Sequence, residues 1–423
     1  MDSLFGKLSL ALKDKILRRR ILFVAGMLIV FRLLAAIPIP GIDVARLEAF
    51  FSDNQFLGLL NIFSGGGLSN LSIVMLGVGP YITGSIIMQL LTMMSPKLKA
   101  LYHEEGEAGR ARFSQYSRLL TVPLAIIQAL GFLVLLERQG VVPDLSTLQT
   151  TINIIIVTGG SVLLMWLGEI MTEFGIGNGL SLIIFAGIVA SIPSAVSQVI
   201  FGFDPSQIPV YLAFLAAALV IIWGVVVVTE AERPIPVTYA KRVRGNKVFG
   251  GVSTYLPLRV NQAGVIPIIF ALSILLFPQM IVSFLANLNN PLIQQVSTAL
   301  LAVFNNGWFY SGLYFVLVFL FTYFYTAVTF DPDTIATNLQ KSGAFIPGVR
   351  PGDTTAQYIG TVLTRITLVG ATFLALVAVL PLAMQSLTGN TTLAIGGTAL
   401  LIVVSVVLDF VKKVDAQVSM REY

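Results

Sequence analysis

The sequence of 423 residues has no cysteine and a single histidine, His103. The absence of cysteine excludes disulfides, thiolate nucleophiles, zinc ribbons and iron–sulfur clusters. With one imidazole, a His-Glu-x-x-His metal site lacks its second histidine, and a Ser-His dyad would depend on His103 alone. Hydrolytic enzymes therefore match this composition poorly. We expect no catalytic residue, no metal site and no cofactor.

Charged residues are scarce as well, at 11% of the chain, whereas 56% is hydrophobic and the mean hydropathy is +0.87. A soluble domain carries about a quarter of its residues as charged side chains. This composition excludes an ordinary soluble protein and predicts a polytopic membrane protein. The formal net charge of +5 is better explained by basic loops on one face than by sequence-specific binding of nucleic acid.

Long apolar runs are abundant. A helix needs about 20 apolar residues to cross the hydrocarbon core of a bilayer. The run that follows Arg18, Arg19 and Arg20 resembles a signal peptide, but it has no convincing cleavage site, so we interpret it as a retained span. The sequence predicts ten transmembrane helices, at residues 21–38, 73–93, 118–136, 151–171, 180–200, 210–230, 264–286, 309–330, 365–386 and 393–411.

The basic residues are distributed unevenly between the two sides. Of the 26, 23 lie before the first span, after the last span or on alternate loops, while Arg46 and Arg138 are the only ones on the other set of loops. Because basic loops stay in the cytoplasm, this pattern predicts cytoplasmic termini. Five spans precede the loop 231–263 and five follow it, which suggests two halves of opposite topology. We expect an amphipathic N-terminal segment 1–20, a first half 21–200, a second half 201–413 and a short cytoplasmic tail 414–423.

Two long polar loops, 231–263 and 331–364, lie on the predicted cytoplasmic side. Loops of this size commonly bind or gate something. Their basic residues either enforce topology or dock a partner, and the residues in question are Lys241, Arg242, Arg244, Lys247 and Arg350.

The outer segment 39–72 contains a short apolar stretch, 56–63, followed by Ser64 and three glycines. This stretch is too short to cross the bilayer and too apolar for an exposed loop. A re-entrant helix buried among the spans satisfies both constraints. An interfacial helix with a flexible linker is the alternative.

Charged residues within the spans are few: Arg32 in the first, Glu169 and Glu173 near the end of the fourth, and Asp409 near the end of the tenth. For the three acids we favour solvated helix ends, and for Arg32 a role in packing and anchoring. Neutral polar residues, such as Ser85, Gln89 and Asn261, instead interrupt or flank the spans, where they either act as static contacts between helices or form weak bonds that break and re-form.

At these residues the sequence resembles the SecY family of bacterial protein-conducting channels, from about Ile37 through Lys413. The stretches that carry the resemblance occur in order along the chain. They are Ile-Pro-Ile-Pro-Gly-Ile-Asp (37–43), Asn-Ile-Phe-Ser-Gly-Gly (61–66), Pro-Tyr-Ile-Thr-Gly-Ser-Ile-Ile-Met-Gln-Leu-Leu (80–91), Trp-Leu-Gly-Glu (166–169), Gly-Ile-Gly-Asn-Gly (175–179), Leu-Pro-Leu-Arg-Val-Asn-Gln-Ala-Gly-Val-Ile-Pro (256–267), Lys-Ser-Gly-Ala-Phe-Ile-Pro-Gly-Val-Arg-Pro-Gly (341–352) and Gly-Gly-Thr-Ala-Leu-Leu-Ile-Val-Val (396–404).

The resemblance implies an all-α fold of ten helices in two inverted five-helix halves around an hourglass pore, with a re-entrant plug at about 57–70. It also implies a lateral gate between the second and third spans and the seventh and eighth. It assigns a pore ring to Val78, Ile82, Ile184, Ile188, Ile269 and Ile402, the plug to Leu60, Asn61, Ile62, Phe63, Ser64, Gly65, Gly66 and Gly67, and the polar gate cluster to Ser85, Gln89 and Asn261.

The implied function is non-enzymatic: passing unfolded polypeptides across the bacterial plasma membrane and releasing transmembrane segments sideways into lipid. The implied partners are the SecE and SecG subunits, the SecA motor ATPase, the ribosome, signal sequences and nascent polypeptides. An inverted-repeat secondary transporter is the alternative, disfavoured because acids for ion coupling are scarce in the spans. An intramembrane protease is disfavoured because His103 falls in a predicted cytoplasmic loop.

Overall fold

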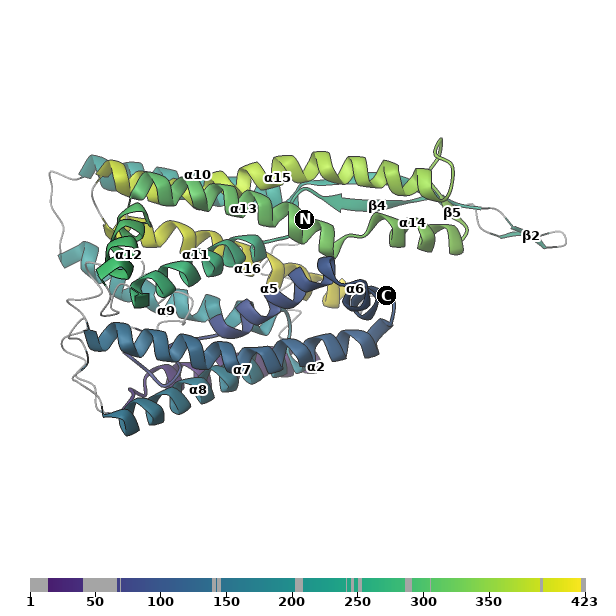
Figure 1. Ribbon diagram of the computed structural model, residues 1–423. Helices are drawn as coiled ribbons and strands as arrows, with labels where there is room; N and C mark the ends of the chain where they lie inside the picture. Colours follow the sequence, from purple (N-terminus) through teal and green to yellow (C-terminus); the bar gives the residue numbers. More distant parts are fainter. Residues whose placement is uncertain are drawn as a thin grey trace.

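The structure is a computed structural model that describes residues 14–40, 67–68, 70–138, 142, 146–201, 208–240, 242–244, 247–249, 253–285, 291–304, 306–388 and 391–419. Most helices run along the length of one bundle, and a short hairpin of strands projects from one end (Figure 1). In chain order the elements are α2 (Lys15–Ala35), α5 (Gly79–Met94), α6 (Pro96–His103), α7 (Gly106–Arg138), α8 (Thr147–Phe174), α9 (Gly179–Phe201), α10 (Ile208–Glu230), β1 (Glu232–Tyr239), β2 (Arg242–Arg244), β3 (Lys247–Phe249), β4 (Ser253–Arg259), α11 (Ile266–Leu285), α12 (Pro291–Phe304), α13 (Gly307–Thr329), α14 (Pro332–Lys341), β5 (Ala344–Phe345), α15 (Asp353–Thr388) and α16 (Thr391–Ser419).

Helices occupy all ten positions predicted for spans, namely α2, α5, α7, α8, α9, α10, α11, α13, α15 and α16. The predicted helical polytopic fold is confirmed. Within the described residues, five stretches are long and apolar enough to cross a membrane by length and composition alone: Gly106–Val134, Thr147–Phe174, Tyr211–Glu230, Gly307–Lys341 and Asp353–Leu380.

The second predicted span starts later than its hydropathy suggests. Residues 71–78 form turns, and α5 begins only at Gly79, with Pro80 in its first turn, where a fixed φ and a missing N–H are tolerated. Gly77 has φ +58°, and its carbonyl accepts a hydrogen bond of 2.9 Å from the buried Ser161 hydroxyl of α8. α8 approaches this segment closely because Gly160 has no side chain; a Cβ there would collide with the carbonyl of Ile73. The turns bring Val78 to the centre of the bundle, fully buried.

The two polar loops are joined by a sheet that the sequence analysis did not predict. β1 pairs antiparallel with β4 and also with β5, so that Thr238 lies opposite Phe345. Apolar side chains of the sheet, including Val237 and Leu258, are buried against Ile359 and Val362 of α15. This packing explains why α15 begins at Asp353, inside the predicted loop 331–364. The two loops therefore form one structural unit.

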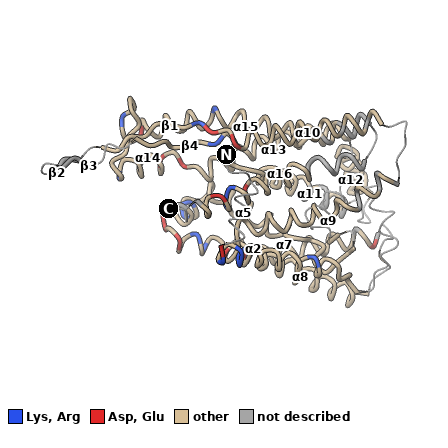
Figure 2. Tube along the Cα trace, turned by 180° about the vertical axis from the view of Figure 1, so that it is seen from behind, with Lys and Arg blue, Asp and Glu red and all other residues tan. Residues whose placement is uncertain are grey.

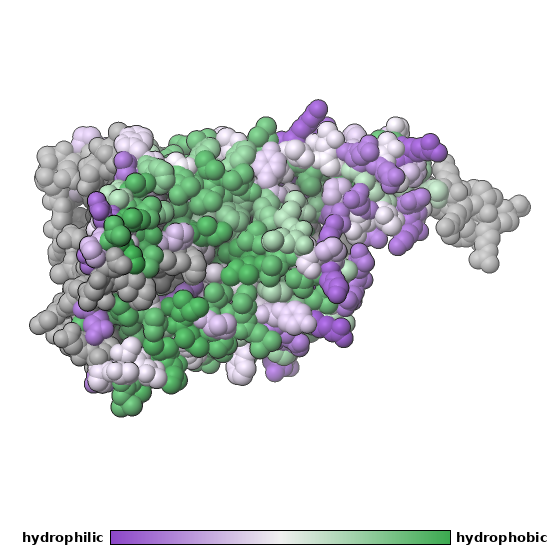
Figure 3. Space-filling view, in the orientation of Figure 1, coloured by the Kyte–Doolittle hydropathy of each residue, from purple (hydrophilic) through white to green (hydrophobic). Residues whose placement is uncertain are grey.

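Charge and hydropathy divide the bundle along its length. Most charged residues gather at the end that carries α6, α14 and the sheet (Figure 2), and the surface beside this end is a broad hydrophobic band (Figure 3). Leu17 of α2, Ile176 of the turn between α8 and α9, and Val414 of α16 are buried together. The start of α2 and the end of α16 are thus on the same side, as an even number of spans requires. α16 continues to Ser419, so the predicted tail begins as helix.

Candidate functional site

Six aliphatic side chains predicted to form a pore ring are buried inside the bundle. They belong to one buried cluster, and none is more than 8% exposed. The helices that carry or adjoin them, α5, α9, α11 and α16, lie between α10, α13 and α15 on one side and α2, α7 and α8 on the other (Figure 1). The six residues are Val78, Ile82, Ile184, Ile188, Ile269 and Ile402.

The local sequence explains how these side chains converge. Ile184 and Ile188 are one turn apart in α9, so they project from one face of that helix. Val78 caps the start of α5, and its carbonyl accepts a hydrogen bond of 3.0 Å from the Ile82 amide one turn later. Ile269 and Ile402 come from helices in the second half of the chain. β-branched side chains have few χ1 rotamers, which makes them stiff packing elements. The buried cluster therefore contains apolar side chains from both halves of the chain.

Buried amide atoms without partners lie near the end of α5 and in the segment before α11, two helices that pack against each other. Gln89 lies near the end of α5, and Asn261 and Gln262 directly precede α11, which packs against α5. Within the described residues, Gln89 Oε1, Asn261 Oδ1 and Gln262 Nε2 are buried and have no hydrogen-bond partner. A buried polar group without a partner costs about 1–3 kcal/mol. Each of these three atoms therefore lowers the stability of the packing around it.

The third predicted gate residue, Ser85, is half-buried in α5. Tyr81, one turn earlier, approaches both Ser85 and Ser114 of α7. Close by, Gly84 packs against α7, where a Cβ would lie 3.2 Å from the carbonyl oxygen of Ser117. Ser85 thus lies beside the contact of α5 with α7, and the tight packing there joins these two helices.

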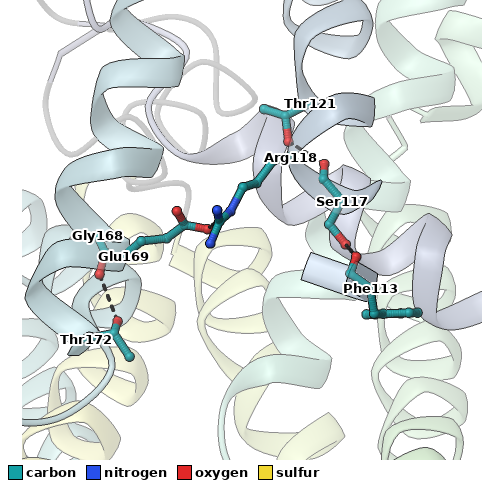
Figure 4. A network of polar contacts seen from close by, with 7 residues as sticks. All are labelled: Phe113, Ser117, Arg118, Thr121, Gly168, Glu169 and Thr172. Carbon is teal, nitrogen blue, oxygen red and sulfur yellow. Dashed lines mark hydrogen bonds and ion pairs between the residues drawn. The ribbon is translucent and has the colours of Figure 1, made fainter. Parts of the chain in front are cut away.

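An ion pair connects α7 to α8 (Figure 4). Arg118 Nε donates to Glu169 Oε1 at 2.7 Å, with the side chains 42% and 20% exposed. Around it, hydroxyls donate to carbonyls one turn back in their own helices, Thr121 to Ser117 and Thr172 to Gly168. The Thr172 hydroxyl also accepts a hydrogen bond of 2.9 Å from the Gly179 amide at the start of α9. Sequence reasoning expected Glu169 at a solvated helix end, and the structure pairs it instead. Arg118 was missed because it was counted as a loop residue, although α7 starts twelve residues earlier at Gly106.

We expect this pair to contribute measurably to stability. Arg118→Gln or Glu169→Gln alone leaves a partly desolvated charge without its partner, whereas the double variant removes both charges. The partial exposure of Arg118 reduces the effect, so we predict a coupling free energy of about 1–2 kcal/mol in a double-mutant cycle on thermal unfolding of the purified protein. Arg112 and Glu105 form the control, since they are 3.8 Å apart with side chains 66% and 48% exposed. Additive effects of the two Arg118 and Glu169 changes would contradict a stabilising pair.

The predicted docking residues lie at the charged end. Arg350 is exposed, and its backbone carbonyl accepts a hydrogen bond of 2.9 Å from the Thr355 hydroxyl at the start of α15. β2 and β3 form the hairpin that projects from the bundle (Figure 1), and their backbone includes the positions of Arg242, Arg244 and Lys247. Lys241 lies outside the described residues.

Of the predicted plug, residues 57–66 and 69 lie outside the described part of the chain. Its downstream end is well anchored. The Gly67 carbonyl accepts a 2.8 Å hydrogen bond from the Ser72 amide, and Leu68 is only 2% exposed. Pro38 and Ser72 form an antiparallel bridge, flanked by a 2.9 Å bond from the Ile39 amide to the Leu71 carbonyl. The residues that precede the predicted plug and those that follow it are therefore held together by backbone hydrogen bonds.

No group of three or more His, Cys, Asp or Glu residues that could hold a metal ion occurs in the part of the chain that the structure describes. What the structure does contain is an apolar core supplied by both halves of a helical bundle, buried amide atoms without partners, and two loops joined by one sheet at one end. These features define a polytopic helical membrane protein with an apolar core drawn from both halves of the chain.

Comparison with known proteins identifies the particular family. The model of the SecY family matches residues 72–411. The protein translocase subunit SecY of Mycobacterium bovis is 42% identical over 439 aligned residues, which cover 96% of each chain. The chain belongs to the SecY family. The prediction of a protein-conducting channel is confirmed at this level, and the secondary-transporter alternative is not supported. The protein is thus membrane-embedded, and its relatives are named as translocase subunits and not as enzymes.

Solved structures agree on the fold. The channel in a study of how the SecY plug domain stabilises the closed state has a TM-score of 0.65 at 19% identity, over 95% of this chain and 92% of that one. Sec61 in the canine ribosome–channel complex from the endoplasmic reticulum has a TM-score of 0.61 at 17% identity, over the same shares of the two chains.

Proposed function

We propose that this chain is the central subunit of a bacterial translocon, which passes unfolded polypeptides across the plasma membrane and releases apolar segments sideways into lipid. The observation that carries the proposal is the convergence of six aliphatic side chains from both halves of the chain in one buried cluster. In this proposal residues 21–200 and 201–413 are the two inverted halves, and both termini are cytoplasmic.

The chemistry of the constriction suits a varied substrate. A channel for unfolded polypeptide meets every type of side chain, so specific ligands along the path would retard it. A narrow aliphatic ring instead adapts to any side chain and resists wetting when empty. The same ring offers no coordinating group to an ion or small solute, which separates this function from that of a transporter.

The lateral gate is proposed at the seam of α5 and α7 with α11 and α13. The unpaired amides of Gln89 and Asn261 support this, because a seam with unsatisfied polar groups loses little when it opens. Contact between α5 and α7 at Gly84 supports their movement as one body. A transmembrane segment that reaches the open seam then partitions into lipid by burying apolar surface.

The segment around 57–70 is proposed as the plug that seals the constriction. The bridge between Pro38 and Ser72 supports this because it holds both ends of the segment together at one point. Leu68 and Leu71 are buried, so these two residues anchor the downstream end of the proposed plug.

The chain has no nucleotide-binding motif, so the work of translocation is assigned to partners, and no enzymatic activity is proposed. SecE and SecG are the proposed membrane partners. The joined loops of the sheet are the proposed docking surface for the SecA motor and the ribosome. A ribosome complex of the similarly folded Sec61 channel supports the latter.

Site-specific cross-linking tests the proposed function. Because the natural chain has no cysteine, Ile188→Cys introduces a single thiol, at a position that is 3% exposed. A secretory polypeptide with one cysteine, arrested during translocation in reconstituted vesicles, should form a disulfide with Ile188→Cys. Leu219→Cys on α10, which is 60% exposed in the apolar band, is the control and should remain unlinked. Equal linking at both positions, or none at Ile188→Cys, would exclude passage through the centre of the bundle.

A further inference from the structure

The most informative feature that the proposed function does not use is α12, which packs against α11 and α13. No span was predicted there, and the helix lies across the direction of the bundle at the end opposite the charged loops (Figure 1). The sequence 286–310, which includes α12, has no charged residue. α12 is therefore a neutral helix that bridges the outer ends of two helices of the proposed gate.

α12 has three faces of different character. One packs on the protein: Ser297 is 2% exposed, and Leu301 and Phe304, at helical spacing from it, are half-buried. A second face is polar and exposed, with Gln294 and Thr298 one turn apart. The third is apolar and exposed, although a helix of a soluble domain would cover such a face. It consists of Leu292, Val296, Leu300 and Val303, which are 72%, 60%, 43% and 44% exposed.

The surroundings indicate what covers this apolar face. Hydrophobic side chains in the region of α12 adjoin the apolar band of the bundle, and hydrophilic ones lie toward its outer edge (Figure 3). Trp308 and Phe309, at the start of α13, are 71% and 45% exposed. Aromatic side chains concentrate where a membrane meets water. A helix with an apolar face toward such a band and a polar face away from it has the arrangement of an interfacial membrane helix.

We propose that α12 docks on phospholipid at the outer boundary of the membrane. Leu292, Val296, Leu300 and Val303 enter the region between headgroups and acyl chains, and Gln294 and Thr298 face water. Because α12 carries no charge, the contact depends on apolar burial and not on anionic headgroups. The helix thereby tethers the outer ends of α11 and α13 to the membrane surface. The proposal rests on membrane embedding alone and is independent of polypeptide transport.

Depth-dependent quenching tests this proposal in the full-length protein. Val296→Cys and Thr298→Cys each place one environment-sensitive fluorophore on α12, on the apolar and the polar face. In phosphatidylcholine vesicles, a nitroxide near the headgroup should quench the label at 296 at least about twofold more than the label at 298, and aqueous iodide should do the reverse. Leu219→Cys on α10 is the depth control and should be quenched best by a nitroxide deep in the acyl chains. Adding phosphatidylglycerol should change none of these values.

Two further variants separate lipid from other occupants. Leu300→Asp should raise the iodide quenching of the label at 296, whereas the matched change Thr298→Asp should leave it unchanged. If iodide quenches the label at 296 as strongly as the label at 298, the apolar face of α12 is exposed to water and the proposal is wrong. If neither the nitroxide nor iodide quenches the label at 296, a protein partner covers the apolar face and the proposal is wrong. If nitroxide quenching of that label appears only when phosphatidylglycerol is present, the contact depends on anionic headgroups and not on apolar burial alone.

Discussion

Replacing the ring isoleucines Ile82, Ile184, Ile188, Ile269 and Ile402 with serine or glycine is expected to make the resting channel leak ions. Each side chain lies in the buried central cluster, and hydrophobic exclusion of water is what closes an apolar constriction. Burial of one isoleucine side chain is worth about 1.5–3 kcal/mol. Since 1.4 kcal/mol is a factor of ten, even a single substitution should raise the conducting fraction by about tenfold.

Single-channel conductance in a planar bilayer measures this effect. Ile188→Ser and the fivefold variant should both conduct at rest, the latter more often. Ile155→Ser on α8, where the side chain is 64% exposed, is the matched control and should behave like the natural protein. Unchanged resting conductance in the fivefold variant would remove these residues from the permeation path.

Arg350→Glu is expected to lower the rate of motor-driven translocation by about tenfold or more at equal protein level. Loss of one partner from a docked, hydrogen-bonded charge pair costs about 2–5 kcal/mol, and reversal of the charge adds repulsion. Arg350 is exposed at the charged end, on the unit built by β1, β4, β5 and α15. If its contact is bidentate, Arg350→Lys should not restore the rate, because lysine lacks the planar fork of donors.

Lys97→Glu provides the control. Lys97 is exposed in α6, at the same end of the bundle, so its reversal changes the net charge equally. Translocation into reconstituted vesicles should fall far less for Lys97→Glu, and its deficit should shrink as salt screens exposed charges. Equal rates for the two variants would show that Arg350 has no special docking role.

Several structural features could be predicted from the sequence because they depend on local composition. Apolar runs placed a helix at each of the ten predicted positions, since a bilayer selects for length and hydropathy. Pairs such as Ile184 and Ile188 have a spacing that puts them on one helix face, which made the ring members identifiable through the resemblance.

Other features escaped because they depend on contacts between distant residues. Arg118 was taken for a loop residue, and only the packing of α7 on α8 shows that its partner is Glu169, 51 positions away. The start of α5 at Gly79 depends on the Ser161 hydroxyl and on space left by Gly160, both on α8. α12 was missed because 14 residues are too few for a span.

The sequence by itself determined that this is a membrane protein, which side carries the charge and which family it belongs to, because hydropathy, the positive-inside bias and motifs are properties of short segments. Tertiary structure decided that six aliphatic side chains from both halves of the chain are buried in one cluster and that strands of two separate loops build one sheet. It also decided that the amide oxygens of Gln89 and Asn261 lack partners among the described residues. These outcomes depend on which helices pack together, and the free energy of that packing is a sum over contacts that no single stretch of sequence contains.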